Sequence, residues 1–109
     1  MSHRKKEYRI VFMTAGNEDE AQRIATALVE KKLAACVNII SPIRSIYRWE
    51  GKIEDEREVL LIAKTQKACV DKLIQEVKKV HSYQVPEIIS LPIESGNEQY
   101  LAWVEENTA

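Results

Sequence analysis

Apolar residues along the chain follow two periods, one typical of strands and one typical of helices. Tyr8 to Ala15 (YRIVFMTA) is rich in β-branched and aromatic residues and predicts a strand. Asn17 then precedes three acidic residues, which is typical of a helix N-terminus, and apolar residues recur at helical spacing from Ala21 to Leu28. Further along, the same patterns predict strands over 35–40, 43–49, 52–65 and 87–93, helices over 18–32 and 66–81, and a short helix after residue 97.

Proline and glycine mark where these strands turn or leave a ladder. Pro42 interrupts the second strand and Pro92 lies in the last one. Because proline cannot donate a hydrogen bond to a ladder, both positions indicate sheet edges or bulges. Glu50-Gly51 predicts the turn of a hairpin between 43–49 and 52–65. The apolar face expected of the second long helix consists of Val70, Leu73, Ile74, Val77 and Val80.

The order of elements is β-α-β-β-α-β with one extra C-terminal helix, which is the ferredoxin-like arrangement. We therefore predict an α+β fold with an antiparallel sheet and an extended β-hairpin. The 109 residues suffice for a single domain, 1–109, and are too few for two. Residues 1–7 contain the basic run His3-Arg4-Lys5-Lys6 and are expected to form a flexible, solvated tail.

The predicted sheet is apolar on both faces. In this arrangement both long helices cover one face, so strands should alternate between apolar and polar residues. Instead Val59 to Ala63 (VLLIA) is continuously apolar, and Ile10 to Met13 and Ile88-Ile89 behave the same way. Because a monomer rarely exposes such a patch, we predict that copies of the chain associate, in a number that this pattern does not fix.

Charge and composition exclude several classes of protein. The formal net charge is −1, which argues against a protein that neutralises nucleic-acid phosphates. The sequence has no signal-peptide pattern and no run of about 18 apolar residues, so we expect a cytoplasmic protein that does not enter a membrane. Cys36 and Cys69 form no C-x-x-C pair and are expected to be reduced. We expect Cys36 in the core, with a redox or metal role as the alternative. We expect Cys69 to be partly exposed at a helix start, where a lowered thiol pKa is the alternative.

No motif of a known catalytic centre is present. The sequence lacks G-x-S-x-G, H-E-x-x-H and a P-loop. The loop Ala15 to Glu18 is acidic where acylphosphatase-like chemistry needs an arginine that cradles phosphate. Val59 to Ala63 lacks the aromatic residues with which RNA-recognition sheets stack bases. We therefore expect a protein that is not an enzyme.

Five segments together resemble the CutA family of divalent-cation tolerance proteins, and the resemblance extends from Arg9 to Val104. The segments, in order, are LAACVN at 33–38, SIYRWEGK at 45–52, EVLLIAKT at 58–65, HSYQVPE at 81–87 and YLAW at 100–103. The resemblance implies a homotrimer of ferredoxin-like subunits, similar in assembly to PII signalling proteins, with long hairpins that pair between subunits. It agrees with the two-faced sheet and adds the number of subunits.

The same resemblance implies an association with copper or other divalent cations, and His81 is the candidate metal ligand. Some bacterial members of the family are expected to bind copper through a cysteine late in the first strand and through adjacent histidines at the start of the motif that corresponds to HSYQVPE. Here those positions hold Met13 and Val80, and Ser82 replaces the usual proline. Methionine can still favour Cu(I), whereas valine cannot ligate a metal. The alternative is that His81 caps the helix C-terminus or lines a cleft. In either case we expect that the protein requires no cofactor, although it could bind copper or another divalent cation.

Most of the large aromatic residues lie near the hairpin, the HSYQVPE loop and the last helix. One interpretation of Tyr47, Trp49, Tyr83 and Trp103 is ordinary packing. The other is that some of them line a cleft between subunits together with Glu58, Lys64 and Glu87, which could hold a small ligand.

Two functional hypotheses follow. The first is a non-enzymatic homotrimer that binds a divalent metal weakly or scaffolds an unidentified protein partner. The second is a PII-like sensor that binds a small molecule in the cleft between subunits.

Overall fold

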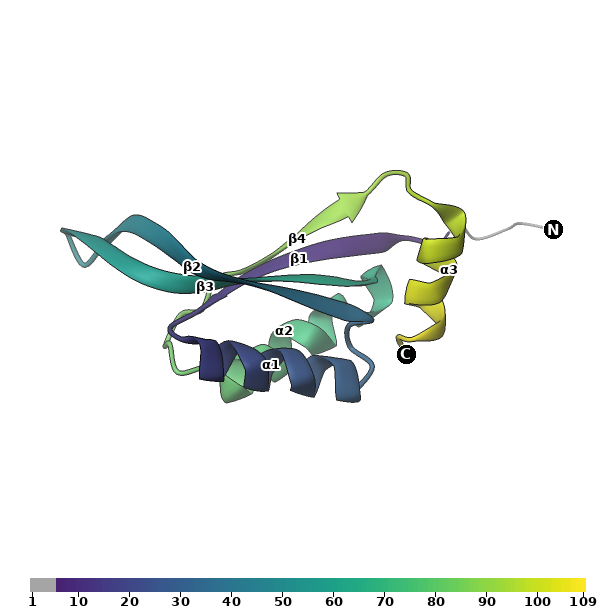
Figure 1. Cartoon of the computed structure of the whole chain (residues 1–109), viewed down its shortest axis with the longest axis horizontal. Coiled ribbons are helices and arrows are strands. Elements are labelled where there is room, and N and C mark those ends of the chain that lie inside the picture. The colour runs from purple at the N-terminus through teal and green to yellow at the C-terminus, as the bar shows by residue number, and fades with distance from the viewer. Residues whose placement is uncertain (1–5) are drawn as a thin grey trace.

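The computed structural model describes residues 6–109 and confirms the predicted α+β fold. Four strands and three α-helices follow one another in the expected order, and a 3₁₀ turn, η1, precedes the second helix (Figure 1). The elements are β1 (Tyr8–Ala15), α1 (Glu18–Glu30), β2 (Cys36–Trp49), β3 (Lys52–Gln66), η1 (Lys67–Cys69), α2 (Val70–Val80), β4 (Ile88–Ile93) and α3 (Glu98–Glu106).

The sheet has the strand order β2-β3-β1-β4, and every neighbouring pair is antiparallel. In the centre of the sheet, Met13 of β1 lies opposite Leu61 of β3 on one side and Ile88 of β4 on the other. The two central strands come from opposite halves of the chain. The ferredoxin-like topology is therefore present, and both proline-containing strands are edge strands, as predicted.

The hydrophobic core lies between the sheet and one layer of helices. Figure 1 shows α1 and α2 side by side on the same face of the sheet. Asn17 caps α1 by accepting a hydrogen bond from the Glu20 N–H (2.8 Å), and acidic residues occupy the first turn, where the helix dipole favours them. The largest fully buried core side chains are Val11, Met13, Ile24, Leu28, Leu61, Leu73 and Val77.

The second long helix is shorter than predicted. Gln66 belongs to β3, where it pairs with Tyr8, and residues 67–69 form the 3₁₀ turn before α2 begins at Val70. Pairing with β1 therefore extends the strand by one residue beyond its predicted end at Thr65. Val80 was expected on the apolar face, but it is exposed because it is the last residue of α2.

The β2–β3 hairpin extends well beyond the rest of the subunit. The register of the two strands shifts by one residue between Ile40 and Ile43, which is the bulge predicted at Pro42. Glu50 and Gly51 form the turn with positive φ values of 49° and 79°. The Cα radius of gyration is 15.0 Å, against about 13 Å for a compact chain of this length. Figure 1 shows the hairpin projecting past the helices as an arm.

The face of the sheet opposite the helices is open. Strand alternation turns Ile10, Phe12, Leu60 and Ile62 away from the helices, and these side chains are half-buried. On the same face, Ile40, Ile89 and Leu91 are 45%, 54% and 49% exposed. We call this set the open face. The predicted apolar character of both sheet faces is therefore confirmed within one chain.

Residues 1–5 of the predicted tail lie outside the described residues. The two remaining residues of the predicted tail, Lys6 and Glu7, are exposed, and the Glu7 carbonyl accepts a hydrogen bond from the Lys67 N–H (2.9 Å).

Candidate functional site

A groove lies where the hairpin arm meets the loop between α2 and β4. Its walls come from Thr14 at the end of β1, from both strands of the hairpin and from residues 83–87 of the loop. Its volume is about 910 Å³, which is in the range of small-molecule sites. The long β2–β3 hairpin and the chain reversal after α2 together create this groove.

The groove brings together five of the seven residues predicted to share a cleft, namely Tyr47, Trp49, Glu58, Tyr83 and Glu87. The other two lie elsewhere in the chain. Lys64 is six residues beyond Glu58 on β3, roughly 20 Å along the strand, and donates a hydrogen bond to the Asn38 side chain. Trp103 is on α3 and packs against Tyr100 at 5.6 Å between ring centroids.

The His81 ring fixes the loop that forms one wall of the groove. The ring is fully buried, and its Nε2 lies 2.7 Å from the Thr14 carbonyl oxygen. The Tyr83 N–H lies 3.0 Å from Nδ1. Because a carbonyl only accepts and an amide N–H only donates, Nε2 carries the proton and Nδ1 accepts. His81 thus joins β1 to the loop, which agrees with the alternative that it is a helix-terminal cleft residue.

Neither His81 nitrogen has a free lone pair in this arrangement, so a metal would have to replace one of the two hydrogen bonds. Within residues 6–109, no three His, Cys, Asp or Glu side chains are grouped so that they could hold a metal ion. The described residues of one chain therefore do not fit a resident metal. His81 as a metal ligand stays a prediction.

Glu20 fastens the same loop to the start of α1. Its buried carboxylate accepts hydrogen bonds from the Gly16 N–H (3.2 Å) and the Ser82 N–H (2.7 Å). Burial opposes ionisation, but the hydrogen bonds from Ser82 and Gly16 outweigh it and hold the pKa of Glu20 below its ordinary value. Its Oε2 lies 4.0 Å from Nδ1 of His81. Because Nδ1 accepts a hydrogen bond from the Tyr83 N–H, it carries no proton that it could donate to Glu20.

The groove is strongly acidic. Four carboxylates line it, from Glu54, Glu56, Glu58 and Glu87. The Tyr83 hydroxyl donates to Oε2 of Glu58 (2.8 Å), and burial together with this contact raises the pKa of Tyr83. Burial and the nearby charges of Glu56, Glu58 and Glu54 also raise the pKa of Tyr47. The groove therefore favours a positively charged guest.

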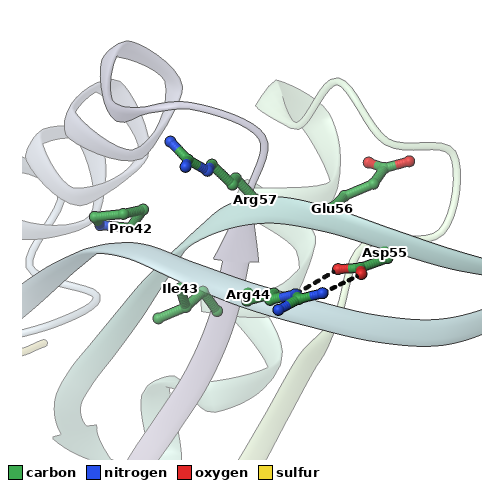
Figure 2. Close-up of a pocket in the computed structure, with 6 residues that line it drawn as sticks. All are labelled: Pro42, Ile43, Arg44, Asp55, Glu56 and Arg57. Atoms are coloured by element: carbon green, nitrogen blue, oxygen red, sulfur yellow. Dashed lines mark hydrogen bonds and ion pairs between the residues drawn. The ribbon is translucent and has the colours of Figure 1, made fainter.

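The cation that lines the groove is already paired. Figure 2 shows a smaller hollow on the hairpin, where the Arg44 side chain reaches from β2 to Asp55 on β3. Its Nε and Nη2 atoms donate to the two Asp55 oxygens at 2.8 and 2.6 Å. Arg57 and Glu56 point away from that pair (Figure 2). Sequence analysis missed Arg44, Glu54 and Glu56, although glutamates at every second position of a strand indicate one acidic face.

The two cysteines lie apart from the groove. Cys69 is buried and its thiol donates to the Ala109 carbonyl (3.1 Å), so the predicted partial exposure is wrong. The C-terminal residues fold back over η1 and cover it, which local sequence does not reveal. Cys36 is half-buried at the start of β2.

The sequence matches the CutA1 divalent ion tolerance protein family over residues 9–107. The protein named divalent-cation tolerance protein CutA from Thermus thermophilus is 50% identical over 99 residues, which cover 91% of this chain and 96% of that protein. Mouse protein CutA is 54% identical over 97 residues, covering 89% of this chain. The chain spans only 55% of the mouse protein's length.

Solved structures agree with these matches. The structure of a divalent cation tolerance protein (Cut A1) from Thermus thermophilus superposes with a TM-score of 0.92 at 48% identity, covering 94% of this chain and 99% of that one. A structure described as a periplasmic divalent cation tolerance protein CutA, from Archaeoglobus fulgidus, gives a TM-score of 0.89 at 46% identity, covering 92% and 97%. In the described part of this chain, no helix is long and apolar enough to cross a membrane.

Proposed function

The chain belongs to the CutA1 divalent ion tolerance family, and from this premise we propose that it acts as a homotrimer without catalytic activity. The observation that carries the proposal is the open face. Ile40, Ile89 and Leu91 are about half exposed there, next to the half-buried Phe12 and Ile62. A contiguous apolar surface of this kind is unusual on a monomer, and copies of the same sheet can cover it.

The hairpin arm supports the same proposal. Ile46 and Ile53 lie near its end and are 64% and 70% exposed. A two-stranded ribbon on its own is only marginally stable in water. Contact with neighbouring subunits would cover these isoleucines and hold the arm, as the family resemblance implies. Because Ile46 also lines the groove, the groove would then lie beside a contact between subunits.

Native mass spectrometry and sedimentation at micromolar concentration test the trimer. We expect three copies for the wild-type chain. Ile89→Asp places a charge on the open face and should dissociate the assembly. Val29→Asp is the matched control, because Val29 is a similarly exposed apolar residue, at 43%, but lies on α1 and not on the open face, and this variant should remain trimeric. A wild-type monomer would overturn the proposal.

Divalent cations are the ligands that the family's name suggests, and we propose that one chain binds them only weakly. The support is the absence of a grouped ligand set within residues 6–109 and the engagement of both His81 nitrogens. The four groove carboxylates are oxygen donors that hard cations accept, whereas copper favours nitrogen and sulfur.

Calorimetric titration with Cu²⁺ tests the role of His81. We expect the wild type and the His81→Ala variant to bind copper equally, which would remove His81 from any copper site. Loss of copper binding in a His81→Ala variant that is still trimeric would instead establish His81 as a ligand.

The groove supports a second candidate function, in which a small molecule binds there and the protein acts as a PII-like sensor. Five of the residues expected in a cleft line one groove of small-molecule size. Four carboxylates in its lining repel phosphate, so nucleotides are poor candidates. A thermal-shift screen of metabolites tests this function, and the absence of any response would count against it.

We also propose that the protein works in the cytoplasm and binds neither nucleic acid nor membranes. If it acts as a scaffold, it binds a protein partner that is not identified. The net charge of −1 supports the absence of nucleic acid. Fractionation of cells that express the chain tests the location, and recovery in another compartment would contradict it.

A further inference from the structure

Glu58 is a buried carboxylate without a cation. It is only 7% exposed, and among residues 6–109 it forms no ion pair. The neutral Tyr83 hydroxyl donates to Oε2, while no described residue donates to Oε1. In the same range, no solvent-inaccessible side-chain oxygen lacks a hydrogen-bond partner, so Oε1 keeps some contact with solvent, and Glu58 is one of the residues that line the groove. A carboxylate that is largely buried and has no cation among the described residues favours a positive group bound in the groove beside it.

Two more carboxylates continue from Glu58 along one face of β3. Glu54, Glu56 and Glu58 alternate along the strand, so all three reach the groove, at intervals of about 6.7 Å. Tyr47 lies directly opposite Glu54 in the ladder and stands beside this row. The lining cation, Arg44, is held by Asp55 and does not neutralise the row.

Aromatic and apolar side chains complete the groove. Tyr47 and Trp49 come from β2, and Tyr83, Val85 and Pro86 come from the loop. Aromatic faces attract organic cations and also pack against methylene groups, which a bare metal ion does not offer. The guest that suits both kinds of wall carries positive charges separated by hydrocarbon.

We propose that the groove binds a linear aliphatic diamine or polyamine, with its ammonium groups at Glu58 and at Glu56 or Glu54 and its methylene chain against Tyr47 and Tyr83. The spacing of the carboxylates along β3 is close to the separation of the two ammonium groups in an extended 1,4-diamine. This inference rests on the groove as the ligand site of the proposed function and names the chemical class of its ligand.

Calorimetric titration with 1,4-diaminobutane at physiological ionic strength tests the proposal. We expect saturable binding of one diamine per subunit, and Glu58→Gln should weaken it by about tenfold or more. Glutamine keeps the shape of the side chain and an acceptor for Tyr83. Glu30→Gln removes the same charge from an exposed position on α1 and should leave the affinity unchanged.

Mg²⁺ is the matched ligand control, because it carries the same charge without hydrocarbon. Equal affinity for Mg²⁺ and the diamine would mean that binding depends on charge alone, and this result would overturn the proposal. Tyr47→Leu should weaken diamine binding by about threefold and leave Mg²⁺ unaffected. No saturable binding, or full affinity in Glu58→Gln, would also overturn it.

Native mass spectrometry of the same samples separates this proposal from the trimer. A trimer that binds no diamine would contradict the proposed ligand class but not the proposed trimer. A monomer that binds the diamine would contradict the proposed trimer but not the proposed ligand of the groove.

Discussion

Glu20 is one of two buried side chains that hold the loop beside the groove, the other being His81. Its carboxylate is buried at the start of α1 and accepts from the Gly16 and Ser82 N–H groups, which lie 66 positions apart in the chain. It therefore joins the β1–α1 loop to the loop that carries Tyr83. Glu20 and the His81 ring thus together set the position of one wall of the groove.

Replacing Glu20 by glutamine should lower the free energy of unfolding at pH 7 by about 1–3 kcal/mol, because an amide nitrogen would face a backbone donor. The folded-state pKa lies below the ordinary value of 4.5, so the carboxylate's contribution is fully present above about pH 4.5 and is lost as the pH falls through the folded-state pKa. Urea unfolding at fixed protein concentration should show the difference between wild type and Glu20→Gln narrowing below pH 4.5.

The control for this prediction is Glu30→Gln on the same helix, which should change stability by less than about 0.5 kcal/mol. An undiminished gap at low pH would show that the Glu20 carboxylate is not the group that titrates.

The β2–β3 hairpin is the element that extends the subunit, and its turn needs two residues with positive φ. Gly51 has a φ of 79°, and a Cβ added there would meet no atom within 4 Å. Gly51→Ala should therefore destabilise the protein by about 1 kcal/mol through backbone strain alone. Asparagine tolerates this conformation better than glutamate, so Glu50→Asn, at a φ of 49°, should stabilise it by a few tenths of a kcal/mol.

Chemical unfolding of both hairpin variants measures these opposite signs. Equal stability of Gly51→Ala and wild type would mean that the turn adopts another conformation at no cost.

The whole molecule has more apolar surface on its sheet than its own helices cover. If subunits bury the open face against one another, unfolding also separates them, and the urea midpoint must rise with protein concentration. We expect this rise for the wild type and its absence in Ile89→Asp. Circular dichroism over a hundredfold range of concentration measures it, and a wild-type midpoint independent of concentration would contradict the assembly.

The sequence by itself determined the order of the elements, the edge strands and the two apolar sheet faces. These features depend on neighbours in the chain: proline at 42 and 92 cannot donate to a central ladder, and apolar runs such as 59–63 supply both faces of a strand at once. The alternation of Glu54, Glu56 and Glu58 along one strand is also visible in the sequence. That these glutamates line a groove depends on the loop that lies beside them in the folded chain.

Only the tertiary structure decided which of the candidate residues meet. Glu58 and Lys64 are close in sequence, yet an extended strand separates them by roughly 20 Å, whereas Tyr83 reaches Glu58 from another element. The role of His81 was decided in the same way, because the Thr14 carbonyl that occupies Nε2 lies 67 positions away. Hydrogen bonds and clefts depend on distances between elements, and local pattern carries no information about those distances.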